Sequence, residues 1–501
     1  MTLGKTDMPS ISRRGFIKSG ALGASALLLP NRTLAEPYRS VIRRTLAEPV
    51  RVRGRVLSGG QGVGGVAISD GWDVVSTDPE GRYELVSTAD RDFIRMTIPS
   101  GYEIPRNTSG TARFYHPVRP DSGGEMEASF DLNPLNRPDE DHALLLLADI
   151  QTETPRDMAL FQSQTIPDVL GTLQTLGHPE AIGEACGDIV YDHPELWPDF
   201  KAGVTKMGIP FFQVPGNHDL DHDAGTDDLS TRTFSNQFGP RYYSFDRGSA
   251  HYVVLDDVFW HGTGYLGYIG SDQLRWLAQD LSLVEAGRPV IVSGHIPVLG
   301  GRHVRLGNEH PAASISVSNR RMLYQLLEPY QAHILTGHTH ENEHVFDSGA
   351  HEHVVGAVCG GWWTGPICGD GTPNGYAVYE IRGEEVTWRY KSTGFDFDHQ
   401  IRVYPRGADP GAPDEFVANV WDWDPEWTVV WYENGERRGE MARRVGTDPL
   451  SRELHSGDDL PPVRPWVNPY IVGHLFYAPA SEGEIRVEAT DRFGRSYTAT
   501  L

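Results

Sequence analysis

The sequence predicts an α/β protein in which a central domain lies between two small all-β domains. Short apolar runs, such as residues 143–148 and 290–292, are typical of buried strands, and they alternate with helical patterns. Before and after this region, apolar and polar residues alternate in short segments separated by turn residues, which indicates β-sheets. The 55 glycines and 35 prolines support many turns.

Composition and charge restrict the function. A chain of 501 residues with 39% hydrophobic residues can form several cores, and its length predicts roughly two to four domains. The formal net charge of −24 argues against nucleic acid or an anionic membrane as a main partner, because both would be repelled. Three cysteines make no disulfide framework, although Cys359 and Cys368 could form one bridge.

The N-terminus predicts export. Residues 12–18, Ser-Arg-Arg-Gly-Phe-Ile-Lys, resemble a twin-arginine signal, and the apolar stretch 20–29 that follows is too short to span a bilayer. We therefore expect a signal peptide over residues 1–35, the twin-arginine translocase as a partner, no stable membrane anchor, and a periplasmic or secreted protein.

The two flanking regions have β patterning. Residues 50–133 predict a small β-sandwich, and their glycine-rich segment 64–71 looks like the transthyretin-like modules found beside secreted enzymes. A linker over 133–142 leads to the central domain, 143–393. There, residues spaced three and four apart, Leu274, Leu277, Leu281 and Val284, predict a helix capped by Ser271. Residues 396–501 return to β patterning, with a hairpin signal at Asn434-Gly435.

Five motifs in the central region carry the chemistry. They are Asp149-Ile150-Gln151, Gly187-Asp188, Gly216-Asn217-His218-Asp219, Gly294-His295 and Gly337-His338-Thr339-His340. Most follow a short apolar run, and α/β sheets place ligands at the carboxyl ends of their strands. Oxygen and nitrogen side chains from five loops suit a pair of divalent metals better than a catalytic triad.

In order and spacing, these motifs resemble the signature of the calcineurin-like metallophosphoesterases. Together with the flanking β regions, the resemblance points to a bacterial exported branch with N- and C-terminal β domains. It implies a four-layer α/β/β/α sandwich with a two-metal site on the loops that join strands to helices. It also implies an enzyme that hydrolyses phosphate mono- or diesters.

The resemblance further implies the metal ligands. Asp188 bridges the two ions, the first ion also binds Asp149, Gln151 and His340, and the second binds the remaining three residues: Asn217, His295 and His338. The sequence leaves the ions open among Mn²⁺, Fe²⁺ or Fe³⁺, and Zn²⁺. A hydroxide shared by two such ions is the expected nucleophile. His338 and His340 reach different ions if their segment is extended, because residues i and i+2 then share a face.

His218 is the expected acid. It resembles the family's histidine that binds no metal, contacts the phosphate and protonates the leaving alkoxide. A carboxylate partner would keep it protonated, and Asp192 is the first candidate for this role, with Asp219 second.

Two positions depart from the family pattern. Gln151 stands where the common motif has histidine, and its carbonyl oxygen is a harder and weaker ligand than imidazole. Tyr191 stands three residues after Asp188, where the usual motif has aspartate, and this spacing resembles the iron-binding tyrosine of purple acid phosphatases. We favour Gln151 as the ligand and Tyr191 as a packing residue.

The substrate is less well defined. Trp362, Trp363 and Asp219 are candidates for contact with a small or lipid-like phosphate ester, although core packing explains the tryptophans equally well. Four arginines near the His295 loop could bind phosphate: Arg302, Arg305, Arg320 and Arg321. Three other histidines are expected to be structural: His142, His333 and His353. His344, His351 and His353 could extend the metal site, but a solvated strand pair is the favoured interpretation. The alternative function is an exported, non-catalytic binding protein whose β modules dock a glycan or another surface ligand.

Overall fold

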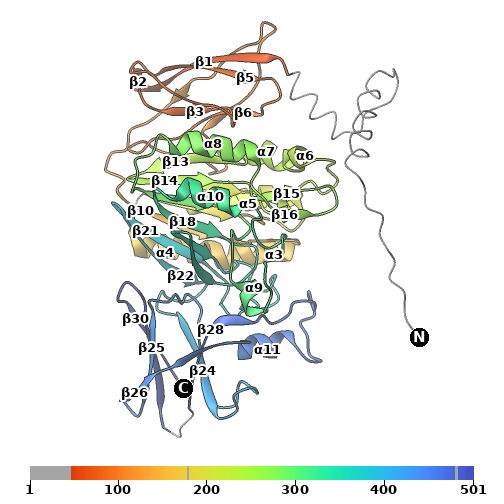
Figure 1. Cartoon of the computed structure of the whole chain (residues 1–501), viewed down its shortest axis with the longest axis vertical. Coiled ribbons are helices and arrows are strands. Elements are labelled where there is room, and N and C mark those ends of the chain that lie inside the picture. Colours follow the sequence, from red (N-terminus) through yellow and green to blue (C-terminus); the bar gives the residue numbers. More distant parts are fainter. Residues whose placement is uncertain (1–46, 178–179, 480–482) are drawn as a thin grey trace, which may run out of the picture. The chain divides into compact units, whose positions relative to one another are not determined.

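The structure is a computed structural model that describes residues 47–177, 180–479 and 483–501 (Figure 1). The predicted signal peptide lies outside the described residues. Within them, no helix combines the length and the apolar character needed to cross a membrane.

Two small sheets form the N-terminal β region. One contains β2 (Gln61–Gly62), β1 (Pro49–Ser58) and β5 (Arg82–Thr88), with β8 (Glu125–Glu127) and β9 (Phe130–Asp131) along β1. The other contains β4 (Val74–Ser76), β3 (Ala67–Ser69), β6 (Phe93–Met96) and β7 (Tyr115–Pro117). Alternate residues of β1, including Val50, Val52 and Val56, are buried, as the sequence pattern predicts.

Two larger sheets form the centre of the molecule. The first has the order β12 (Phe211–Val214), β11 (Ala181–Cys186), β10 (Asp141–Leu147), β21 (Gly375–Arg382) and β22 (Glu385–Ser392). The second has the order β13 (Tyr243–Arg247), β14 (Ala250–Val254), β17 (Pro289–Ser293), β18 (Gln331–Thr336), β20 (Ala350–Val354) and β19 (Glu343–Asp347). The central strands of each sheet pair in parallel, so their carboxyl ends share an edge.

Helices cover the outer face of each large sheet. Near the first sheet lie α3 (Pro155–Leu160), the π-helical turn Phe161–Thr165, α4 (Ile166–Leu176), α5 (Trp197–Met207) and α7 (Arg232–Phe238). Near the second lie α8 (Ser271–Leu281) and α10 (Arg320–Leu327). Leu144 and Leu146 of one sheet pack with Ile291 and Leu335 of the other. The predicted fold class, a four-layer α/β/β/α sandwich with flanking β domains, is confirmed.

The predicted cap of helix α8 is wrong in detail. Gly270 occupies the N-cap position without a side-chain hydrogen bond, and Ser271 is the first helical residue. The helix ends at Leu281, so Val284 lies in the turn that follows.

The remaining short elements connect these layers. They are the 3₁₀ turns Pro194–Leu196 and Asn217–Asp219, α6 (Asp227–Ser230), β15 (Val258–Trp260), β16 (Tyr265–Gly267) and α9 (Arg302–Arg305). All three cysteines are buried and free, so the Cys359–Cys368 bridge is not formed.

Two four-stranded sheets form the C-terminal β region. One has the order β23 (Ile401–Tyr404), β24 (Glu415–Val420), β28 (Val472–Pro479) and β27 (Ala442–Gly446). The other has the order β26 (Glu436–Glu440), β25 (Thr428–Glu433), β29 (Ile485–Thr490) and β30 (Ser496–Thr500), and α11 (Pro449–His455) follows β27. The predicted hairpin at Asn434-Gly435 is confirmed, and both residues have positive φ, as a tight turn between β25 and β26 requires.

Candidate metal centre

The five motifs meet at one edge of the central sheets. Asp149 follows β10, Asp188 follows β11 and Asn217 follows β12, while His295 follows β17 of the second sheet. The Gly337–His340 motif follows β18. We call the seven predicted ligands on these loops the candidate metal centre: Asp149, Gln151, Asp188, Asn217, His295, His338 and His340.

Asp188, His295 and His338 form the tightest group in this centre. One ligand atom from each lies within 4.8 Å of the other two. The Nε2 atom of His295 is 3.3 Å from Asp188 Oδ1 and 3.2 Å from Asn217 Oδ1. These four residues are the predicted ligands of the second metal.

The predicted ligands of the first metal lie beside this group. His340 Nε2 and Asp149 Oδ1 are 3.3 Å apart, yet both atoms are buried and neither forms a hydrogen bond. Gln151 is buried, and its Nε2 donates to Asp188 Oδ2 at 2.9 Å. Buried polar atoms almost always have partners, so two orphaned atoms that face each other fit a site for a cation.

Charge in the centre is balanced between carboxylates and imidazoles. Burial raises the pKa of the Asp188 carboxyl, but the charges of His295 and His218 outweigh burial and leave that pKa well below its usual range. Burial lowers the pKa of His295, but Asp188 outweighs it and raises the pKa to about 10. Burial and the charge of His295 lower the pKa of His338 to about 4.

The loops of the centre have strained backbones. Non-glycine residues with positive φ include Asp149 (51°), Gln151 (47°), Asp188 (48°), His338 (68°) and His340 (51°). Each such residue costs about 1–3 kcal/mol, and this kind of strain is concentrated at functional sites. The prediction of an extended segment at residues 338–340 is therefore wrong, because both histidines are left-handed and the chain bends there. Their side chains nevertheless reach the two groups that the sequence predicted.

Close packing explains why glycines precede the ligands. A Cβ atom on Gly187 would lie 2.2 Å from His295 Nδ1, and one on Gly337 would lie 2.4 Å from Asp149 Oδ2. Any side chain at either position would displace a predicted ligand.

His218 lies beside the centre and points to Asp192. Its Nδ1 is 2.7 Å from Asp192 Oδ1, and the Tyr191 ring stacks on it with a centroid distance of 4.0 Å. Burial lowers the pKa of His218, but Asp188 and Asp192 outweigh burial and hold the pKa above its usual value. Of the two predicted partners, Asp192 is therefore the one in contact.

Asp219 does not face the site. Its carboxylate is buried and accepts hydrogen bonds from the backbone N–H groups of Gly216, Ile189 and Val190. These bonds fix the two loops that carry Asp188 and Asn217. The predictions of substrate contact and of a partner role for Asp219 are therefore not supported, because its oxygens are occupied by the backbone.

The two predicted tryptophans have different settings. Trp363 is in the core, and its Nε1 donates to the backbone oxygen of Ile150 at 3.0 Å. Trp362 stacks on the His340 ring with a centroid distance of 4.1 Å. Its ring also contacts Trp466, which belongs to the C-terminal β region and is 48% exposed.

Sequence reasoning missed the residue that brings this C-terminal segment to the site. Arg464 donates to the Trp362 backbone oxygen at 2.6 Å, to Glu153 at 2.7 Å and to Asp157 at 2.5 Å. Only the Pro-Trp that follows Arg464 could have marked the segment, and nothing in the sequence says where it docks. Arg305, a predicted phosphate ligand, instead pairs with Glu341 and Glu343.

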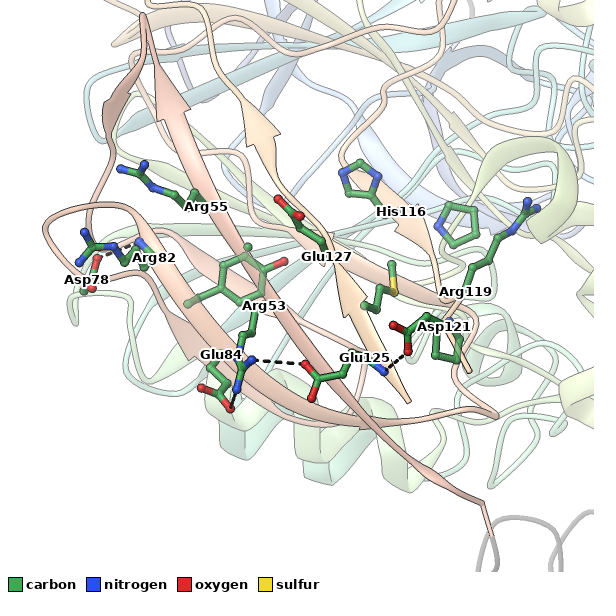
Figure 2. Close-up of a pocket in the computed structure, with 15 residues that line it drawn as sticks. Arg53, Arg55, Asp78, Arg82, Glu84, His116, Arg119, Asp121, Glu125 and Glu127 are labelled. Carbon is green, nitrogen blue, oxygen red and sulfur yellow. Dashed lines mark hydrogen bonds and ion pairs between the residues drawn. The ribbon is translucent and has the colours of Figure 1, made fainter. Parts of the chain in front are cut away.

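One cavity lies away from the centre, in the N-terminal β region. It is a groove of about 1060 Å³, lined mainly by charged side chains (Figure 2). Many of these charges are paired with each other, since Arg53 lies 3.3 Å from Glu125 and 3.5 Å from Glu84. The groove is therefore a solvated face, and its volume indicates no catalytic role.

Comparison with known families decides the identity of the fold. The family model for calcineurin-like phosphoesterase matches residues 130–342, and models for the N- and C-terminal parts of such proteins match residues 50–135 and 352–497. The chain belongs to the calcineurin-like phosphoesterases. The predicted family is confirmed, and a hydrolase of phosphoester bonds agrees with it. The family implies divalent metal ions.

Relatives of known name match only part of the chain. A bovine serine/threonine-protein phosphatase, CPPED1, is 25% identical over 222 residues, which are 41% of this chain and 66% of that protein. A probable cyclic nucleotide phosphodiesterase of Psychrobacter sp. (strain PRwf-1) is 27% identical, over 31% of this chain and 45% of that protein.

The solved structures that the chain resembles have lower sequence identity. A dimetal phosphatase from Danio rerio has 16% identity and a TM-score of 0.34, and the match covers 50% of this chain and 96% of that one. A purple acid phosphatase from yellow lupin has 14% identity and a TM-score of 0.36, over 69% and 67% of the two chains.

Proposed function

We propose that this protein is an exported phosphoesterase with two divalent metal ions. The observation that carries the proposal is the convergence of two ligand groups on Asp188, with the His218–Asp192 pair beside them. Asp149, Gln151, Asp188 and His340 would hold one ion, and Asp188, Asn217, His295 and His338 the other. When bound, such ions lower the pKa of a water molecule and neutralise phosphoryl oxygens.

His218 supplies the proton in this mechanism. Since Nδ1 is held by Asp192, Nε2 is the atom that carries a proton towards the leaving alkoxide. Asp192 keeps the imidazole protonated and oriented, and the stacked Tyr191 ring restricts its rotation.

The position of Tyr191 favours Gln151 as the metal ligand. The tyrosine lies flat against His218, whereas the Gln151 amide already contacts the bridging carboxylate. A half-turn of the amide places its carbonyl oxygen where Nε2 now lies, since the two ends of the group have the same shape. A purple, iron-loaded protein that lost its colour in Tyr191→Phe would contradict this assignment.

The aromatic pair Trp362–Trp466 suits an ester with an apolar or planar alcohol group. It adjoins His340, so a substrate whose phosphate lies at the metals can place its alcohol against these rings. The named relatives include a protein phosphatase and a cyclic nucleotide phosphodiesterase, so both monoesters and diesters are candidate substrates.

Hydrolysis of p-nitrophenyl phosphate and bis-p-nitrophenyl phosphate with added Mn²⁺ tests the activity. We expect turnover that a chelator abolishes and Mn²⁺ restores. A protein that holds two metals and hydrolyses no ester would instead favour the non-catalytic binding protein.

Export is tested separately. The proposal expects the chain in the periplasm or the medium, and Arg13→Lys with Arg14→Lys should retain it in the cytoplasm. Unchanged export of that double variant would contradict the twin-arginine route.

A further inference from the structure

Four histidines outside the candidate metal centre gather on one face of the second large sheet. Strand register explains this: His333 of β18 is paired with His351 of β20, and His344 of β19 is paired with His353 of β20. Because alternate residues of a strand share a face, His351 and His353 point the same way. We call these four residues the inter-sheet histidine cluster.

The cluster lies between the two central sheets. The ring of Trp388, on β22 of the first sheet, is 4.7 Å from His353 and 4.9 Å from His351 by centroid distance. His351 is 7% exposed and His353 is 1% exposed. The prediction of a solvated strand pair is therefore wrong, because a second sheet covers this face. Neighbouring positions in the same layer hold apolar side chains such as Leu335.

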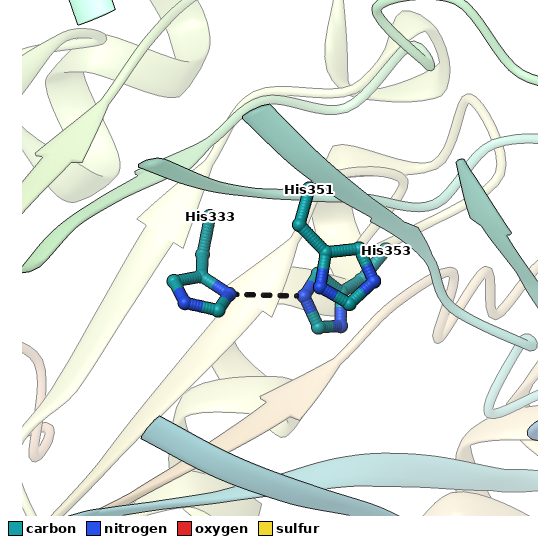
Figure 3. A group of neighbouring side chains, drawn as sticks. All are labelled: His333, His351 and His353. Atoms are coloured by element: carbon teal, nitrogen blue, oxygen red, sulfur yellow. Dashed lines mark hydrogen bonds between the residues drawn. The ribbon is translucent and has the colours of Figure 1, made fainter. Parts of the chain in front are cut away.

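Three of these side chains, His333, His351 and His353, lie close together (Figure 3). One nitrogen each from His333, His351 and His353 lies within 4.8 Å of the other two, and among the described residues only the candidate metal centre offers a comparable group. His333 Nδ1 is 3.2 Å from His353 Nε2, close to the spacing of two ligands on one tetrahedral ion. The other nitrogen of His353, Nδ1, is buried without a hydrogen bond.

A buried carboxylate orients the fourth histidine. His344 Nε2 is 3.0 Å from Asp422 Oδ1, and its Nδ1 is 3.1 Å from His351 Nε2. When Nε2 donates a hydrogen bond to the carboxylate, Nδ1 of His344 has a lone pair that accepts a hydrogen bond from His351 Nε2. The Asp422–His344 pair therefore orients His351, as hydrogen-bond partners orient the histidines that bind metals.

We propose that the inter-sheet histidine cluster binds one divalent transition-metal ion through His333, His351 and His353. Neutral imidazoles select zinc, cobalt, nickel or copper over magnesium or calcium, and no carboxylate is among the three ligands. This site is separate from the proposed catalytic one and does not depend on it.

A cavity of about 430 Å³ opens beside the site. It is lined by His333, His351, Phe346 and Arg492, so a water molecule or a small anion has room at the fourth position of the ion. The Arg492 guanidinium would repel a cation, but it pairs with Asp424 at 2.7 Å and with Glu426 at 3.2 Å.

Metal counting tests the site on the full chain. The protein is stripped with a chelator, dialysed against Zn²⁺ and measured by elemental analysis, beside the double variant His333→Asn/His351→Asn. We expect the wild type to hold one Zn²⁺ more per chain than the variant. Because the test compares the zinc contents of two proteins, its outcome does not depend on how many ions the candidate metal centre binds. Equal zinc contents would overturn the proposal.

Two controls make the result specific. The double variant His261→Asn/His310→Asn removes two exposed histidines and should keep the wild-type zinc content; loss of one ion there would also overturn the proposal. If His333→Asn/His351→Asn is unfolded by circular dichroism, His351→Gln is counted in its place. A folded His351→Gln protein that keeps the additional Zn²⁺, and shows the same Co²⁺ absorption band as the wild type, would also overturn the proposal.

Discussion

The candidate metal centre and the inter-sheet histidine cluster place similar side chains in opposite settings. The centre is built on loops after strand ends, where His338 and His340 have left-handed backbones. The cluster is built within the regular strands β18, β19 and β20. The centre contains two carboxylates, Asp149 and Asp188, whereas the cluster contains none and contacts Asp422 through His344. Strained loops with anionic ligands suit hydrolysis, and a neutral pocket between sheets suits an ion that is simply held.

Of the changes considered, Asp188→Asn should have the largest effect. It should affect the candidate metal centre and leave the inter-sheet histidine cluster unchanged. This carboxylate is the one that both ligand groups of the centre contact, so its loss should lower phosphoesterase activity by about 10⁴-fold and remove metal from the centre. The zinc held by the inter-sheet cluster should remain. Elemental analysis and hydrolysis of bis-p-nitrophenyl phosphate measure both, with Asp223→Asn, at an exposed aspartate, as the matched control. Full activity in Asp188→Asn would contradict the ligand assignment.

His218→Asn should reduce catalysis without loss of any metal. The side chain faces Asp192 rather than a ligand group, so kcat should fall by about 10³-fold, as expected for a lost general acid. Metal content per chain should equal that of the wild type. Loss of a metal ion in His218→Asn would show that His218 is itself a ligand and belongs to the candidate metal centre.

The centre could be predicted from the sequence, because its ligands stand next to strands and glycines along the chain. Gly187 and Gly337 mark the close approaches that the structure requires. The cluster could not be predicted as a separate site, because it depends on which strands pair and in which register. His333 and His351 are 18 positions apart, and a shift of one residue in β20 would turn His351 to the other face.

The same limit applies to the C-terminal β region. Its strands and its hairpin follow from local patterns, which a single sequence displays directly. The docking of Arg464 on Asp157 joins segments more than 300 residues apart, and no local pattern encodes such a contact. The fold class was therefore predictable from the sequence. The docking of the C-terminal segment beside the candidate metal centre was not.

Asp192→Asn should shift the pH profile of the centre. Asp192 helps to hold the pKa of His218 above its usual value, so its removal lowers that pKa. Because the acid must be protonated, activity falls as pH rises through this pKa, and the descending limb should move to lower pH. We expect kcat/KM on the alkaline side of the profile to fall below that of the wild type at the same pH. An unmoved limb in a plot of kcat/KM against pH would contradict the role of Asp192.

Trp466→Ala should alter substrate binding rather than chemistry. The C-terminal β region supplies Trp466 near the centre and Arg492 near the cluster, so it contributes to both sites. Loss of one aromatic contact should raise KM by about fivefold for an aryl ester and leave kcat nearly constant. Trp431→Ala, on strand β25 of the same region, is the control. A fall in kcat as large as the expected rise in KM would mean that Trp466 stabilises the loops of the centre and does not contact the substrate.

Gln151→His should have the smallest effect and bears most directly on the difference between the two sites. It replaces a neutral oxygen ligand of the centre with an imidazole, which makes the first metal position more like the inter-sheet cluster. Since imidazole favours zinc over manganese, the centre should need less Zn²⁺ for half-maximal activity, while kcat with Mn²⁺ stays within about threefold. Titration of the stripped protein with each metal measures this preference. If the variant and the wild type respond identically to both metals, Gln151 does not bind the first ion, and its contact with Asp188 serves only to orient the bridging carboxylate.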